Sequence, residues 1–254
     1  MNFSANLGFL FTELTLPEAI RAAKTAGFAA VECHFPYDVP PADVKAALDE
    51  TGLPMLGLNT RPGDTASGDF GLAALPSRRD EARQAIEQAV AYGAAIGARN
   101  VHVMAGKIGV AGEATFHENL AFACDLAAGH DIGILIEPIN QRDAPGYHLS
   151  RVEQAADVIA AVGKPNLRMM FDCYHTQIMQ GDLTRRIERH LPLVGHIQIA
   201  AVPDRGEPNE GEVNFPALLN SIRALGYTAP IGAEYRPRSG NTHDGLGWLT
   251  AYRP

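Results

Sequence analysis

The sequence predicts a single (β/α)₈ barrel, and three observations support this prediction. Short apolar segments alternate with longer segments whose apolar residues recur at i, i+3 and i+4, as in parallel strands joined by helices. Eight such units fill the 254 residues, at a spacing of roughly 32 residues that suits a closed barrel. No linker or low-complexity segment interrupts them, so we expect residues 1–254 to form one domain.

The expected strands are short runs rich in β-branched and apolar residues. They span residues 3–7, 29–33, 54–59, 100–104, 133–137, 167–172, 194–199 and 230–235. Helices are expected between them, and the 3.6-residue period is clear at 79–96 and 151–162. Pro17 suits the first turn of the first helix, where its missing N–H costs little. Gly27 and Gly97 follow helical segments and are interpreted as helix ends.

The alternative architecture is an open, doubly wound sheet. That fold would favour a glycine-rich first turn of the G-x-G-x-x-G kind, which residues 6–10 do not supply. The two longest irregular stretches, 60–77 and 200–214, both follow strand ends. In a barrel these stretches would overhang the face on which barrel enzymes carry their active sites.

The charge of the chain argues against several classes of partner. Its formal net charge is −8, and no run of Lys or Arg is present. An acidic surface repels phosphate backbones and anionic lipids, so we expect no nucleic-acid partner and no membrane partner. No segment approaches the roughly 20 apolar residues of a membrane span. The expected partner is a small molecule, and both a monomer and a homo-oligomer remain open.

The cysteines and the N-terminus indicate the compartment. Cys33, Cys124 and Cys173 are scattered and form no C-x-x-C pair, which is typical of a reducing cytoplasm. Residues 1–10 lack the basic region and the long apolar run of a signal peptide. We therefore expect a cytoplasmic protein.

The last residues of the four late strands give the strongest functional signal. Glu137 ends the fifth strand, Asp172 ends the sixth, Gln198 lies in the seventh and Glu234 lies near the end of the eighth. The carboxyl ends of barrel strands meet at one face, where the active sites of this fold class lie. We therefore expect these four oxygen-bearing side chains to converge.

These four side chains suit a metal ion. A single acid at a strand end usually caps a helix or forms an ion pair, so each residue alone carries little weight. Three neighbouring carboxylates, however, raise each other's pKa unless a cation lies among them. Three acids and one amide oxygen form a hard ligand set that favours Mg²⁺ or Mn²⁺ over Zn²⁺. The predicted cofactor is a divalent metal, Mg²⁺ or Mn²⁺, bound by Glu137, Asp172, Gln198 and Glu234.

Several local motifs resemble one family of enzymes. They are Glu137-Pro138-Ile139-Asn140, Phe171-Asp172-Cys173-Tyr174-His175, His196-Ile197-Gln198-Ile199-Ala200, Asp204-Arg205-Gly206-Glu207-Pro208, Gly211-Glu212-Val213-Asn214 and Glu234-Tyr235. With these motifs the chain resembles the hydroxypyruvate isomerases, which belong to the xylose-isomerase-like TIM barrels. A sister group, the 2-oxo-tetronate isomerases, is similar over the same length, and Ala105-Gly106 and Val202-Pro203-Asp204-Arg205 are closer to it.

The resemblance implies roles for individual residues. Glu137 and Glu234 would be the acid–base pair, and His175 and Arg205 would contact the substrate. Gln198 would take the strand-seven ligand position, which is a histidine in the related ketose 3-epimerases. Because an amide oxygen binds metals more weakly than imidazole does, this departure bears on metal affinity.

The implied reaction interconverts hydroxypyruvate and tartronate semialdehyde. A carboxylate would act as the base, and a metal would stabilise the enediolate. Arg205 would pair with the substrate's carboxylate. Lys107 follows the fourth strand and Glu207 shares a loop with Arg205, so both are further candidates for substrate binding. For these two residues a purely structural role in the loop is the alternative.

Four other functions remain as alternatives. Two are enzymes of the same kind, a 2-oxo-tetronate isomerase and a ketose 3-epimerase, which product analysis would distinguish. A DNA-repair protein of the endonuclease IV type shares the barrel, but it would need several zinc ions with many histidine ligands. The last alternative is a barrel that binds a sugar acid without turnover, and the pairing of Glu137 with Glu234 argues against it.

Overall fold

A computed structural model describes residues 1–252, except for the side chains of residues 109 and 110. Its eight strands are all parallel and form one sheet in the order β2-β1-β8-β7-β6-β5-β4-β3. The strands are β1 Phe3–Asn6, β2 Ala30–Glu32, β3 Leu58–Asn59, β4 Asn100–His102, β5 Gly133–Ile136, β6 Leu167–Asp172, β7 Val194–Ile199 and β8 Ile231–Ala233.

The sheet closes between β2 and the residues that precede β3. Val31 bridges Met55 in parallel, its N–H donates to Pro54 O at 3.0 Å, and Leu56 N–H donates to Val31 O at 2.7 Å. The third strand is therefore shorter than the predicted 54–59, because its first half meets β2 only through this isolated bridge. The structure confirms the predicted barrel.

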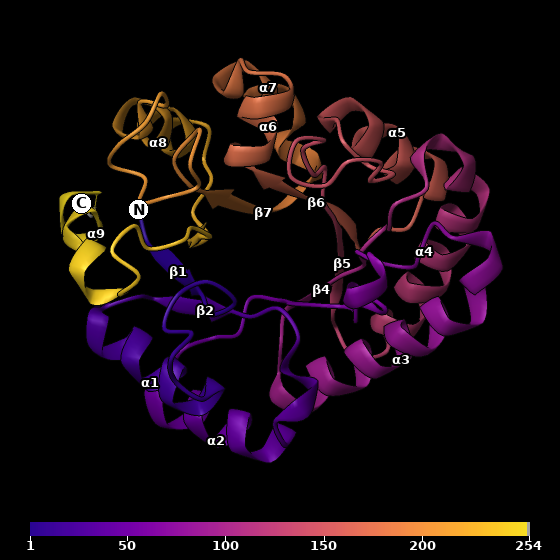
Figure 1. Cartoon of the computed structure of the whole chain (residues 1–254), viewed down its shortest axis with the longest axis horizontal. Coiled ribbons are helices and arrows are strands. Elements are labelled where there is room, and N and C mark those ends of the chain that lie inside the picture. The colour runs from indigo at the N-terminus through magenta and orange to yellow at the C-terminus, as the bar shows by residue number, and fades with distance from the viewer. Residues whose placement is uncertain (253–254) are drawn as a thin grey trace.

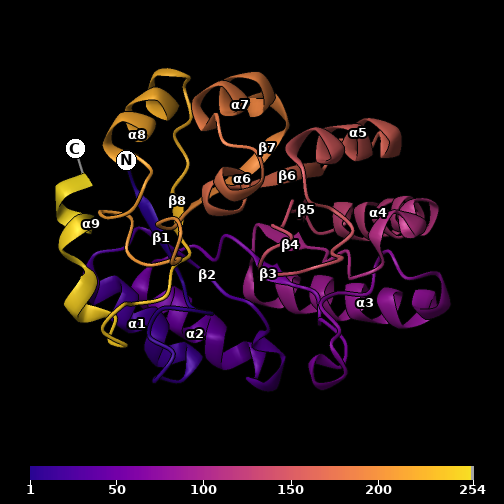
Figure 2. The ribbon, with the colours of Figure 1, turned by 45° about the horizontal axis from the view of Figure 1, so that its top comes forward.

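The helices form a ring outside the strands (Figures 1 and 2). They are α1 Leu16–Ala26, α2 Pro41–Thr51, α3 Arg79–Ile96, α4 Glu113–Ala128, α5 Val152–Val162, α6 Cys173–Met179, α7 Leu183–His190, α8 Phe215–Ala224 and α9 Gly247–Tyr252. Short 3₁₀ turns lie at Pro36–Asp38, Thr65–Ser67, Pro76–Arg78, Gly109–Gly112, Leu191–Leu193 and His243–Gly245. Within residues 1–252 no helix combines the length and the apolar character needed to cross a bilayer.

Local chemistry sets the helix ends. The Glu18 carboxylate accepts the backbone N–H of Thr15 at 3.0 Å, which satisfies a donor just before α1. Gly27 ends α1 with a φ of 91°, a left-handed conformation that only glycine adopts without cost. At the other end of the chain α9 packs on the first strand, with the rings of Phe3 and Trp248 5.0 Å apart (Figure 1).

Strand β7 turns apolar side chains outward and polar ones inward. Ile197 and Ile199 pack in the core between strands and helices, whereas His196 and Gln198 point into the barrel. This alternation follows from the two-residue period of a strand. The barrel interior below the carboxyl-end face is mixed, because Leu135 and Met170 line the same space as these polar side chains.

Candidate active site

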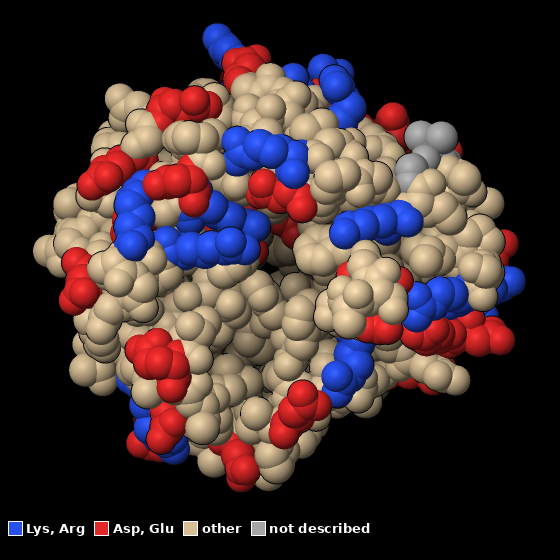
Figure 3. All heavy atoms as spheres, viewed as in Figure 1, with Lys and Arg blue, Asp and Glu red and all other residues tan. Residues whose placement is uncertain are grey.

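A cavity of about 460 Å³ opens at the carboxyl ends of the strands. Figure 3 shows it as the central hollow of the face seen in Figure 1. The cavity is lined by the charged and polar residues Glu137, His175, Arg205 and Glu234 and by the apolar residues Phe35, Phe70 and Met104. The cavity thus pairs convergent polar groups with an apolar surface, as small-molecule sites do.

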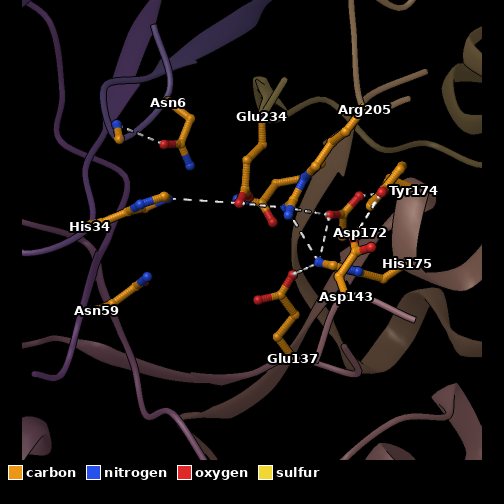
Figure 4. A network of polar contacts seen from close by, with 12 residues as sticks. Asn6, His34, Asn59, Glu137, Asp143, Asp172, Tyr174, His175, Arg205 and Glu234 are labelled. Carbon is orange, nitrogen blue, oxygen red and sulfur yellow. Dashed lines mark hydrogen bonds and ion pairs between the residues drawn. The ribbon is translucent and has the colours of Figure 1, made fainter. Parts of the chain in front are cut away.

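Glu137 and Glu234 face one another across this cavity. Glu137 directly follows β5, Glu234 directly follows β8, and both are more than 90% buried. Their carboxylates point toward each other in Figure 4, with His175 and Arg205 on one side of the gap. Two of the predicted ligands therefore share one cavity although 97 positions (234 − 137) separate them in the sequence.

Arg205 occupies the centre of the acidic group. Its Nη2 lies 2.9 Å from Glu234 Oε1 and 3.5 Å from Asp172 Oδ2. Its guanidinium stacks on the rings of Phe9 and Tyr174, with 4.9 Å to each centroid. The backbone reaches this point through a left-handed conformation at Arg205, where φ is 58°. Aromatic stacking and two carboxylates thus hold this side chain in one place.

Asp172 ends β6, and its two carboxylate oxygens have different roles: one caps a helix and the other faces the cavity. Oδ1 accepts the backbone N–H of Tyr174 at 2.8 Å and caps α6. Oδ2 faces Arg205 Nη2 at 3.5 Å and His175 Nε2 at 3.5 Å. The helix cap therefore orients the carboxylate so that one oxygen points into the cavity.

Hydrogen-bond donors face both ring nitrogens of His175. Nδ1 accepts the backbone N–H of Asn140 at 3.3 Å and lies 2.6 Å from Asn140 Nδ2. Nε2 lies 3.3 Å from Arg205 Nη2, which can only donate, and 3.7 Å from Glu137 Oε1. Burial first, and then the charge of Arg205, lower the pKa of His175 to about 3, so the ring is neutral. A neutral ring accepts at one nitrogen only, so these contacts are compatible with either tautomer.

Gln198 is held by a residue that the sequence did not single out. Its Nε2 donates to Glu32 Oε2 at 3.1 Å, and the same oxygen lies 2.9 Å from His196 Nε2. Because Glu32 fixes the amide nitrogen, the opposite atom, Gln198 Oε1, is left buried and without a hydrogen-bond partner among the described residues. The sequence could have indicated Glu32, because a glutamate inside an apolar strand is costly to bury unless it is paired.

The pKa values of the two facing glutamates are shifted in opposite directions. Burial, followed by the charges of Glu234 and Asp172, raises the pKa of Glu137 well above its ordinary value. Burial also acts on Glu234, but the charge of Arg205 and the contact with His34 outweigh it and lower the pKa of Glu234 to about 2. Of the two carboxyls, Glu137 therefore keeps its proton to the higher pH.

The donor set fits a hard divalent cation. Oxygen or nitrogen atoms of Glu137, Asp172 and His175 all lie within 4.8 Å of one another. Glu137 Oε1 and Gln198 Oε1 are buried oxygens without a hydrogen-bond partner among the described residues. Unpaired buried oxygens beside other carboxylates are suitable ligands for Mg²⁺ or Mn²⁺.

The structure differs from the expectation at two of the predicted binding residues. Glu207 pairs with Arg238 Nη1 at 2.9 Å, and it is not among the described residues that line the cavity. Lys107 is exposed, and its Nζ lies 5.7 Å from the ring centroid of Phe70, outside the cavity lining that the structure describes. Both depend on loop conformations, which residue spacing does not determine. For both residues the structure favours the structural alternative.

Comparison with known proteins identifies the family. The model of the xylose isomerase-like TIM barrel family matches residues 20–252. The chain is 46% identical to the 2-oxo-tetronate isomerase of Cupriavidus necator, over 98% of both chains. It is 38% identical to the hydroxypyruvate isomerase of Escherichia coli, over 100% of both.

Solved structures agree with this result. The crystal structure of a Brucella melitensis protein described as AP endonuclease, family 2, is 41% identical and superposes with a TM-score of 0.95, covering 100% of this chain and 99% of that one. The sequence matches to the isomerases extend over the whole chain and confirm the resemblance seen in the motifs. The chain therefore belongs to the hydroxypyruvate isomerase family within the xylose isomerase-like TIM barrels.

Proposed function

We propose that this chain interconverts hydroxypyruvate and tartronate semialdehyde, using Glu137 and Glu234 as the acid–base pair. Sugar-acid isomerase activity follows from its family, and the substrate and the residue roles are the proposal. The observation that supports it most is that two buried glutamates face each other across one cavity with pKa values shifted in opposite directions. Titratable pairs with pKa values shifted in opposite directions mark acid and base assignments in enzymes.

The reaction moves one proton between adjacent carbons. Ionised Glu234 removes a proton from C3, the electrons form the C2–C3 double bond of an enediolate, and protonated Glu137 delivers a proton to C2. The hydroxyl proton passes from O3 to O2, so the product carries an aldehyde at C3 and a hydroxyl at C2. His175 in its Nε2-protonated tautomer, which the contact of Nδ1 with the Asn140 N–H favours, would donate a hydrogen bond toward the negative charge that develops on oxygen.

A divalent cation, Mg²⁺ or Mn²⁺, belongs to this proposal. Glu137, Asp172, Gln198 and Glu234 would bind it, and the two unpaired oxygens described above support that choice. When bound, the cation would stabilise the negative charge of the enediolate as a Lewis acid. We also propose a cytoplasmic location, which the three free and buried cysteines favour.

Two further substrates are tested beside hydroxypyruvate. A 2-oxo-tetronate has one more carbon, and the identity to the Cupriavidus necator protein makes it the second candidate. DNA with an abasic site is the third, because of the description of the Brucella melitensis structure. The net charge of −8 and the single group of candidate metal ligands in residues 1–252 argue against DNA.

The experiment incubates the purified protein with each substrate in D₂O, with Mg²⁺, with Mn²⁺ and with chelator. Proton NMR follows the oxo acids, and gel electrophoresis follows the DNA. We expect product and deuterium incorporation with hydroxypyruvate, reduced by chelator. Faster turnover of the tetronate would reassign the substrate, and cleavage of DNA without oxo-acid turnover would contradict the proposal.

A further inference from the structure

Three arginines, Arg205, Arg236 and Arg238, lie on the loops that follow β7 and β8. Arg205 and Arg236 line the cavity, and Figure 3 shows Lys and Arg side chains gathered beside the hollow. Arg205 is paired with Glu234 at 2.9 Å, and Arg238 is paired with Asp204 at 2.7 Å. These two guanidiniums therefore already have carboxylate partners within the protein.

Arg236 is different because the described residues give its charge no partner. It lines the same cavity as Glu137 and Glu234, and its side chain is exposed. No carboxylate in residues 1–252 forms an ion pair with it, whereas nine of the other arginines form one. Its backbone is nevertheless fixed, since its N–H donates to Arg205 O at 2.8 Å.

The ring of Phe9 holds this guanidinium at the cavity. The Arg236 guanidinium carbon lies 5.4 Å from the ring centroid, and that of Arg205 lies 4.9 Å from the same centroid. Two cations on one ring repel each other, and only Arg205 has carboxylates to offset its charge. An anion bound at Arg236 would remove this imbalance, and a planar carboxylate matches the fork of a guanidinium.

We propose that Arg236 binds the carboxylate of the substrate and so selects oxo acids over uncharged hydroxyketones. This inference rests on the proposed function, and it transfers to Arg236 a role that the sequence suggested for Arg205. Arg205 is the less suitable partner because Glu234 and Asp172 already neutralise it. With the carboxylate held at the mouth, C2 and C3 reach inward toward the facing glutamates.

The test uses Arg236→Gln, Arg236→Lys and a matched control, Arg189→Gln. Arg189 is an exposed arginine on α7, so the control removes the same charge away from the cavity. The binding probe is tartronate, a hydroxy dicarboxylate with no carbonyl group to isomerise, titrated by calorimetry at fixed ionic strength. Circular dichroism melts establish that each variant is folded.

We expect Arg236→Gln to raise the Kd of tartronate about tenfold or more, which corresponds to about 1.4 kcal/mol. The KM for hydroxypyruvate rises more than kcat falls, and the preference for hydroxypyruvate over dihydroxyacetone decreases. For Arg236→Lys we expect a Kd and a KM between those of the wild type and Arg236→Gln, because lysine keeps the charge but loses the bidentate geometry. Arg189→Gln behaves as the wild type.

Failure of this inference is separable from failure of the proposed function. If hydroxypyruvate is turned over and Arg236→Gln matches Arg189→Gln in both KM and tartronate affinity, the assignment of Arg236 is overturned and the isomerase stands. If tartronate binds through Arg236 but no oxo acid is isomerised, the anion site stands and the substrate proposal falls. Absence of tartronate binding to the wild type, together with an unchanged KM in Arg236→Gln, would also overturn the inference.

Discussion

The Nη2 atom of Arg205 lies 2.9 Å from Oε1 of Glu234, and this ion pair sets the ionisation of the facing glutamates. Burial alone would raise the pKa of both carboxyls, but only Glu234 has a guanidinium in contact. The difference between two similar residues therefore comes from a third residue on another loop.

Replacing Arg205 should reduce the fraction of Glu234 that is ionised and able to act as the base. Without its guanidinium the pKa of Glu234 rises, so a smaller fraction of Glu234 is ionised at neutral pH. For Arg205→Gln we expect kcat/KM at pH 7 to fall about 10²-fold, and the acid limb of the pH–rate profile to move to higher pH. Arg205→Lys keeps a positive charge and should retain more of the original profile. An unshifted limb in Arg205→Gln would show that Arg205 does not control the ionisation of Glu234.

Metal binding should depend on pH through Asp172. Burial, together with the charge of Glu234, outweighs Arg205 and raises the pKa of Asp172 to about 7. The folded protein then binds this proton more tightly than the unfolded chain, so this group's contribution to stability is lost as pH rises toward 7. A divalent cation must displace the proton, and its affinity should increase over the same range.

Thermal melts with and without Mn²⁺ measure this effect. We expect Mn²⁺ to raise Tm more at pH 7.5 than at pH 5.5. Asp172→Asn, which cannot titrate, should show a smaller shift with less dependence on pH. A Tm increase that is equal at both pH values in the wild type would contradict the assignment of Asp172 as a metal ligand.

Glu32 should act on the metal site through Gln198. It accepts the Gln198 Nε2–H and thereby leaves Oε1 unpaired. In Glu32→Gln the amide of Gln198 loses its charged acceptor, and we expect the Kd of Mn²⁺ to rise about tenfold. Ser4→Ala is the control, because Ser4 Oγ contacts Glu32 only at 3.5 Å. Calorimetry with Mn²⁺ alone measures both Kd values without an activity assay. Equal Mn²⁺ affinities in Glu32→Gln and Ser4→Ala would contradict the proposed effect of Glu32 on the metal site.

The sequence predicted the fold well, because the alternation of strand and helix periods is a local pattern. The strands at residues 167–172 and 194–199 and the helix at 79–96 have the predicted bounds. Glu137 and Glu234 were found because a barrel brings the carboxyl ends of its strands to one face. Strand period and strand order were sufficient for these inferences.

The remaining parts of the site depend on contacts between distant loops. Glu207 was expected near the substrate, but Arg238 from the loop after β8 binds it instead. Arg205 was expected to be available to a substrate anion, yet Glu234 and Asp172 contact it. The conformation of the folded loops determines which arginine at the cavity lacks a carboxylate partner, and residue spacing does not predict it.

The most direct test of the facing glutamates is deuterium exchange at C3 of hydroxypyruvate in D₂O, followed by proton NMR in Glu137→Gln and Glu234→Gln. In Glu137→Gln, Glu234 still removes the C3 proton while delivery to C2 is impaired, so deuterium should enter C3 with product formation reduced about 10²–10⁴-fold. In Glu234→Gln both exchange and product formation should fall to the uncatalysed rate. Wild-type rates of exchange in Glu234→Gln, or wild-type turnover in Glu137→Gln, would contradict the account.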